Sequence, residues 1–172
     1  MKINFENTQK NNLVEYLKYT LIGFFFLFIH IFIIHYFEIY GVVPDIILIL
    51  GVWITIKEGR FIGLLYIFIF GLFFDIINNE YYGLTSISKI AAIFFVGVFY
   101  EDDKYILLLS NFKFAIVVFF SSIINNIIFY LFDFRETNYD FSTYIIYYVS
   151  ANAFYTSFLS MILVVYYSNK RF

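Results

Sequence analysis

Six charged or amide side chains stand inside apolar runs of this 172-residue chain, and any chemistry or polar contact would be concentrated there. A charged group at the centre of a bilayer costs about 2.5–3.5 kcal/mol on insertion scales, so each such group needs a partner or a function. The six residues are Asp45, Asp75, Lys89, Asn125, Asn126 and Asn152.

The two carboxylates have different expected roles. Asp45 follows Pro44, and this pair suits the first turn of a helix, where a proline loses no hydrogen bond and a carboxylate meets the positive end of the dipole. Asp75 ends Gly71-Leu72-Phe73-Phe74-Asp75 inside the third apolar run, and we expect it at the same outer level of the bilayer as Asp45. Lys89, inside the next apolar run, is its natural partner, and we predict an Asp75–Lys89 contact. The alternative is that both side chains reach separately to water.

Small and amide residues indicate how neighbouring helices pack. Gly63, Ile67, Gly71 and Asp75 recur at steps of four and form one stripe, which is a candidate helix-packing or partner surface. Asn125, Asn126 and Asn152 are expected to hydrogen-bond between helices, with a substrate-binding role as the alternative.

The sequence shows no pattern of residues typical of an enzyme. The chain has no cysteine, which removes thiol nucleophiles and cysteine-ligated metals. His30 and His35 are five residues apart, or about 140° around a helix, so they do not face one metal ion. None of the common hydrolase, metalloprotease, P-loop or dinucleotide motifs is present. We therefore predict a non-enzymatic protein with no catalytic residue, no metal and no cofactor.

Composition places these residues in a membrane. The chain is 62% hydrophobic and 14% charged, whereas soluble domains are about 45–50% apolar and about 25% charged. The formal net charge of −2 argues against nucleic acid as a partner. The lipid bilayer is the expected surrounding.

The apolar runs predict an all-α fold. They are continuous, unlike the alternating segments of a transmembrane barrel, so helices are favoured. We predict one integral membrane domain over 1–172 with six transmembrane helices, at about 20–38, 44–57, 61–77, 84–100, 113–132 and 141–167.

The second run is short enough to be a re-entrant segment, and basic residues decide against this. With six spans and both termini in the cytoplasm, nine of the eleven Lys and Arg residues lie inside, as the positive-inside rule expects. A re-entrant second run would leave only five inside. The six-span topology makes Lys57-Glu58-Gly59-Arg60 a tight cytoplasmic turn.

The order of these features resembles the MreD family of bacterial rod-shape membrane proteins. The resemblance is sharpest over 41–100 and is carried by Pro44, Asp45, Gly63, Gly71, Asp75 and Gly83. The family often has Arg before the proline, where this chain has Val43.

The resemblance implies a fold similar to the substrate-binding subunits of energy-coupling-factor vitamin transporters. It also implies a bacterial cytoplasmic membrane protein that works with MreC, and indirectly with MreB, RodA and its penicillin-binding transpeptidase. Its role would be to position or activate peptidoglycan synthesis along the side wall. The alternative is a vitamin-type binding subunit of a transporter. Against this alternative, Gly23-Phe24-Phe25-Phe26-Leu27 lacks the alanine-spaced face that such subunits use for docking.

Overall fold

The structure is a bundle of helices, known from a computed structural model that describes residues 2–78, 83–99, 105–133, 142 and 144–169. These residues form no strand beyond an isolated bridge between Ile39 and Val42. The α-helices are α1 (Lys2–Phe32), α2 (Ile46–Glu58), α3 (Arg60–Asn78), α4 (Leu84–Val96), α5 (Tyr105–Leu109), α6 (Lys113–Asp133) and α8 (Ser150–Ser168). Shorter turns are η1 (Ile34–Phe37), η2 (Gly97–Phe99) and the π-helical η3 (Tyr144–Val149).

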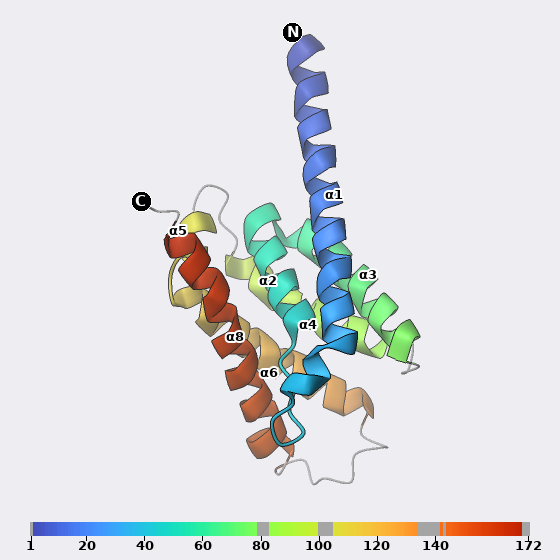
Figure 1. Cartoon of the computed structure of the whole chain (residues 1–172), viewed down its shortest axis with the longest axis vertical. Helices are drawn as coiled ribbons and strands as arrows, with labels where there is room; N and C mark the ends of the chain where they lie inside the picture. The colour runs from blue at the N-terminus through green and yellow to red at the C-terminus, as the bar shows by residue number, and fades with distance from the viewer. Residues whose placement is uncertain (1, 79–82, 100–104, 134–141, 143, 170–172) are drawn as a thin grey trace.

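The long helices run up and down the bundle. Helix α1 begins, and α8 ends, toward the same end of the molecule, and the first turns of α1 project well beyond the other helices (Figure 1). Helices α3 and α4 pack along each other, as do α6 and α8. The connection between η1 and α2 lies toward the opposite end, and from it α2 runs toward the end at which α1 begins (Figure 1).

Helix α2 is the centre of the bundle. It contacts α1, α3, α4, α5, α6 and α8, and nine of its 13 residues are buried. A helix that is apolar all round is one that is buried on every side. Its length of about 20 Å is shorter than a bilayer core, but its neighbours enclose it, so its apolar surface does not depend on lipid.

The outer surface of the bundle is apolar as well. Phe25 and Phe28 on α1, and Phe154 and Phe158 on α8, are all exposed. Four helical segments are long and apolar enough to cross a bilayer, at Val14–Phe32, Arg60–Asn78, Lys113–Phe132 and Ile146–Ser168. An apolar exterior on such helices identifies a helical membrane protein.

The largest departure from the expected helix ranges is at the start of the chain. The first span was predicted to begin near residue 20, but α1 begins at Lys2, because no proline or glycine interrupts the helix before Gly23. It ends at Phe32 and is followed by the separate turn η1. Positions 100 and 141, which bound the fourth and sixth predicted spans, lie outside the described residues.

The turn between α2 and α3 is as tight as the sequence indicates. Helix α2 ends at Glu58, α3 begins at Arg60, and Gly59 alone joins them with φ of 94° and ψ of 165°. Only glycine adopts this backbone conformation readily, which explains why the turn contains it.

The stripe of small residues on α3 lies inside the bundle. Gly63, Ile67, Gly71 and Asp75 are all buried. A methyl group added at Gly63 would lie 2.9 Å from the Thr55 Cα of α2, and one added at Gly71 would lie 2.8 Å from the Ser86 Cα of α4. The stripe therefore packs α3 against α2 and α4 within this chain, and it is not a free partner surface.

Candidate functional site: a buried polar network

Asp45 forms the start of α2. Its Oδ1 accepts a hydrogen bond of 2.8 Å from the Leu48 backbone N–H, which confirms the capping role. Its own backbone N–H donates to Thr156 Oγ1 of α8 at 3.0 Å. Pro44 lies before this cap rather than in the first turn of the helix, because α2 begins only at Ile46. The carboxylate of Asp45 thus fixes the start of α2, and its backbone N–H ties this start to α8.

The second oxygen of Asp45 forms an ion pair with Lys89. Lys89 Nζ donates to Asp45 Oδ2, and the two side chains are 4% and 10% exposed. The predicted Asp75–Lys89 pair is therefore wrong. Helices α2 and α4 pack directly against each other, which brings the start of α2 to the lysine. Lys89 thereby gains the buried counter-charge that its position requires.

Asp75 has a local role instead. Its Oδ2 accepts a hydrogen bond of 2.8 Å from the backbone N–H of Gly83, the residue that caps α4. Gly83 has φ of 95° and ψ of −8°, in the left-handed region. The buried carboxylate at the end of α3 therefore fixes the start of α4, which accounts for the pairing of an aspartate with a glycine eight residues later.

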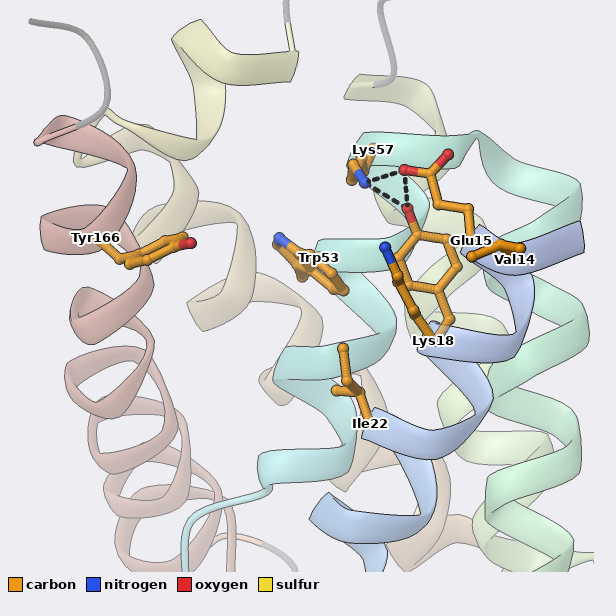
Figure 2. A pocket seen from close by; sticks show the side chains of 8 residues that line it. Val14, Glu15, Lys18, Ile22, Trp53, Lys57 and Tyr166 are labelled. Atoms are coloured by element: carbon orange, nitrogen blue, oxygen red, sulfur yellow. Dashed lines mark hydrogen bonds and ion pairs between the residues drawn. The ribbon is translucent and has the colours of Figure 1, made fainter. Parts of the chain in front are cut away.

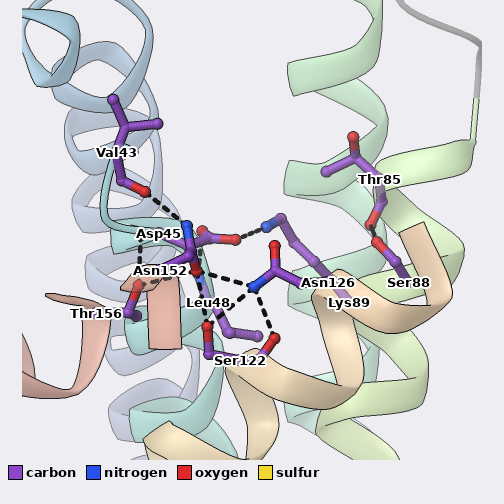
Figure 3. Close-up of polar contacts among 10 residues, drawn as sticks. All are labelled: Val43, Asp45, Leu48, Thr85, Ser88, Lys89, Ser122, Asn126, Asn152 and Thr156. Carbon is purple, nitrogen blue, oxygen red and sulfur yellow. Dashed lines mark hydrogen bonds and ion pairs between the residues drawn. The ribbon is translucent and has the colours of Figure 1, made fainter. Parts of the chain in front are cut away.

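Asn152 of α8 is the hub of the network (Figure 3). Its Oδ1 accepts from Ser122 Oγ at 2.8 Å and from Asn126 Nδ2 at 2.9 Å, and both donors lie on α6. Its Nδ2 donates to the Val43 carbonyl at 2.7 Å. One amide thus joins α8, α6 and the segment before α2, as expected of polar side chains between membrane helices.

The orientations of these amides follow from their partners. A carbonyl only accepts, so the atom of Asn152 that faces Val43 must be its nitrogen. The oxygen of Asn152 then faces α6, and Asn126 must present its nitrogen to it. The oxygen of Asn126 points away from Asn152 (Figure 3).

A cavity of about 420 Å³ adjoins the network. Asp45, Lys89, Asn126 and Asn152 line it on one side, together with Asn125. The rest of the wall comes from α1, η1, α3, α4, α6, η3 and the segment before α2. It contains His30, Ile34, Val43, Phe74, Asn78, Thr85, Ser88, Phe129, Tyr144 and Tyr148. The predicted hydrogen bond from Asn125 to another helix is not found among the described residues, where its Oδ1 is buried without a hydrogen-bond partner.

A second polar cluster lies at the other end of α2 (Figure 2). Lys57 Nζ is 3.0 Å from Glu15 Oε1 of α1 and 3.5 Å from Glu58 Oε1. The buried Tyr19 hydroxyl lies between these groups and bonds with both Lys57 and Glu58. The open cavity beside this cluster measures about 610 Å³. Lys57 of α2 pairs with Glu15 of α1, and the Tyr19 hydroxyl of α1 donates to Glu58 of α2, so this cluster ties α1 to α2.

Ser122 and Thr156 also belong to the buried network, although neither is among the residues predicted from the sequence. A signal was present, because Ser122 stands four residues before Asn126 and Thr156 stands four residues after Asn152. Such steps place each pair on one helix face and predict a polar stripe on α6 and on α8. His30 also lines the cavity, beside Phe74 at a ring distance of 5.2 Å.

The network links helices by hydrogen bonds and one ion pair. Its charges are opposite and paired, so its chemistry is that of holding helices and presenting polar atoms to the cavity. Comparison of the chain with families of known proteins, with curated proteins and with solved structures finds no match.

Proposed function

We propose that the chain is a non-enzymatic membrane component of the bacterial side-wall elongation complex. In this role it acts with MreC and, through it, with MreB, RodA and the penicillin-binding transpeptidase to position or activate peptidoglycan synthesis. The proposal rests on the resemblance to MreD carried by six residues between Pro44 and Gly83.

One observation supports this proposal above the others: five of the six residues, all except Pro44, have identifiable structural roles in the described bundle. Asp45 caps α2, Gly63 and Gly71 allow close helix contact, and Asp75 binds the Gly83 backbone. A chance coincidence of residue types would not be expected to place them at such positions. Because these roles depend on where the residues lie in the bundle, they support the proposal that the spacing reflects the family's fold.

The proposed topology has six membrane crossings in the bacterial cytoplasmic membrane, with both ends of the chain in the cytoplasm. It is supported by the placement of α1 and α8, which begin and end toward the same end of the bundle (Figure 1). Lys57 and Arg60 flank the α2–α3 turn, and basic residues collect on the cytoplasmic side. The Asp45–Lys89 pair then belongs to the extracytoplasmic half.

We also propose that the fold is of the kind found in substrate-binding subunits of energy-coupling-factor transporters. The transporter role itself is less favoured. A docking face on the first helix would need small, accessible residues, but a methyl group at Gly23 would lie 1.9 Å from the Phe70 ring. The accessible positions beside it are the bulky Phe24 and Phe25.

The proposal is tested in the source bacterium by depletion and cross-linking. We expect depleted cells to become round, and we expect a photo-reactive residue at Phe25 of α1 or Phe158 of α8 to cross-link MreC, because both positions are exposed on the apolar exterior. A matched probe at buried Ile54 should give no cross-link to MreC. Rod-shaped depleted cells, with no cross-link from either exposed helix, would contradict the proposal.

A further inference from the structure

One face of α2 is only partly covered by the other helices. Nine of the 13 residues of α2 are buried, and the four that are not include Ile46, Trp53 and Lys57. Their spacing of seven and four residues places them on one face of the helix. Helices α1 and α8 contact α2 and stand on either side of it (Figure 1). The three helices therefore form a groove with α2 as its floor.

The part of this groove between Ile46 and Trp53 is apolar throughout. It is a cavity of about 430 Å³, lined only by aliphatic and aromatic side chains. Apolar surface in a membrane protein is covered either by lipid or by another apolar group. The walls on α1 and α8 are formed by Ile22, Phe26 and Ile29, and by Leu159, Ile162 and Leu163, respectively.

At the Trp53 end the groove adjoins the polar cavity beside Lys57 (Figure 2). Ile22 and Trp53 line both cavities, so the apolar and the polar part are continuous. The Trp53 indole N–H donates to the Tyr167 hydroxyl of α8 at 3.0 Å. Tryptophan collects at the level of lipid headgroups, with its ring in apolar surroundings and its N–H bonded. The groove thus has a charged end and an apolar remainder, as a lipid does.

Lys18 is the cation that the charged end offers to a ligand. It lines the polar cavity and extends from α1 toward Lys57 (Figure 2). Lys57 is paired with Glu15 and Glu58, whereas Lys18 forms no ion pair with any residue that the structure describes. An ammonium group binds phosphate oxygens through charge-assisted hydrogen bonds. The charged end therefore suits a phosphate group.

The size of the groove favours a hydrocarbon chain over a partner helix. A helix about 10 Å wide occupies roughly 1,200 Å³ over ten residues. This is nearly three times the volume of the apolar part of the groove. A partner helix can lie over the groove but cannot fill it, whereas an extended acyl chain is thin enough to enter.

We propose that the groove binds one phospholipid, with its phosphate on Lys18 and one acyl chain over α2 between α1 and α8. On the six-span topology proposed above, this lipid belongs to the cytoplasmic leaflet. The acyl chain completes the cover of α2 and fills the space between α1 and α8. The site does not depend on a role in cell shape, and its charged end lies at the opposite end of α2 from the Asp45–Lys89 pair.

The fluorescence of Trp53 reports on this site, because Trp53 is the only tryptophan of the chain. The full chain in dodecyl maltoside micelles, which contain no phosphate, is titrated with phosphatidylglycerol brominated near the headgroup end of its acyl chains. Bromine quenches tryptophan on contact. We expect half-maximal quenching at a mole fraction roughly tenfold lower than with the matching brominated diacylglycerol, the effect of one hydrogen bond to a charged group. Equal mole fractions for the two lipids would overturn the proposal.

Substitutions at Lys18 separate a phosphate contact from general attraction to the protein. Lys18→Gln should remove the tenfold difference between the two brominated lipids, and Lys18→Arg should retain it. Lys113→Gln is the matched control, because Lys113 is an exposed lysine at the start of α6 that lines neither cavity. It should leave the difference unchanged. Equal effects of Lys18→Gln and Lys113→Gln would contradict the assignment of Lys18.

A further measurement needs no variant of Lys18 and distinguishes lipid from a partner helix. A photo-reactive residue replaces Leu163 on the α8 wall, or Val165 on the exposed side of α8 as the control. After exchange from native membranes into dodecyl maltoside, we expect illumination to join a retained phospholipid to position 163 but not to position 165. A product of position 163 with a second protein, or no lipid at position 163, would overturn the proposal.

Discussion

Lys89 of α4 is bound to Asp45, the residue that caps α2, across 44 positions of sequence. The same carboxylate holds the Leu48 backbone N–H with its other oxygen. The Asp45 side chain therefore accepts a backbone hydrogen bond in the first turn of α2 and also supplies the counter-charge for Lys89. This double role links the beginning of the central helix to α4 at one end of the bundle.

Breaking this ion pair from one side should destabilise the bundle strongly. Asn is a good N-cap, so Asp45→Asn removes the charge and keeps the cap. We expect this variant, and Lys89→Met, each to lose about 3–5 kcal/mol of unfolding free energy, because each leaves a buried unpaired charge or polar atom. The measurement is a reversible denaturant titration in mixed micelles.

The double variant Asp45→Asn with Lys89→Met provides the control for this prediction. It leaves no uncompensated charge, so it should be more stable than either single variant. Additive losses in the double variant would show that the two residues do not act as a pair.

The left-handed backbone conformation of Gly83 should determine which substitutions this position tolerates. A methyl group there meets no atom within 4 Å, so the effect of Gly83→Ala is one of conformation alone. We expect a loss of about 1–2 kcal/mol for Ala, and a smaller loss for Asn, which adopts left-handed φ values more readily. Thermal unfolding of the two variants should rank Asn above Ala, and the reverse order would contradict the assignment.

Substitution by alanine should destabilise the bundle more at Gly71 than at Gly51, although both glycines are buried. At Gly71 an added methyl group meets the Ser86 backbone, whereas at Gly51 its nearest contact is the flexible end of Ile67 at 2.6 Å. Gly71→Ala should therefore cost about 1–3 kcal/mol as α3 and α4 move apart, and Gly51→Ala should cost less. Equal losses in a denaturant titration would remove the close-contact explanation.

Substitution of Asn152 should destabilise the bundle far more than substitution of other polar residues of α8. Asn152→Leu leaves the Val43 carbonyl without its donor and removes the acceptor that Ser122 Oγ and Asn126 Nδ2 share. Each abandoned buried group costs about 1–3 kcal/mol. Ser157→Ala removes a single hydrogen bond to the Ala115 carbonyl and serves as the comparison. A similar melting temperature for both variants would show that Asn152 is not a hub.

The helices could be predicted from sequence because apolar runs and breakers mark them directly. The turn at Gly59 follows from a glycine between charged residues, and the inward stripe of α3 follows from steps of four. The early start of α1 was missed because polarity was used as the boundary, although helix formation depends on the absence of proline and glycine.

The candidate site was predictable as a set of residues but not as a set of pairs. The identity of the buried polar residues follows from their presence in apolar runs. Their partners depend on which helices pack together, and neighbours in sequence are a poor guide to this. Lys89 was assigned to Asp75 of the preceding helix, whereas the central position of α2 gives it Asp45.

We propose that the polar network lies in the extracytoplasmic half of a bundle that crosses the membrane an even number of times. Paired cysteine labelling tests it most directly, because the chain has no cysteine of its own. Tyr40, before α2, and Asn111, between α5 and α6, are both exposed and lie in different connections. An impermeant thiol reagent should label Tyr40→Cys in intact cells, and Asn111→Cys only after the membrane is opened. Labelling of both positions from the same side, or of Asn111→Cys alone in intact cells, would contradict the account.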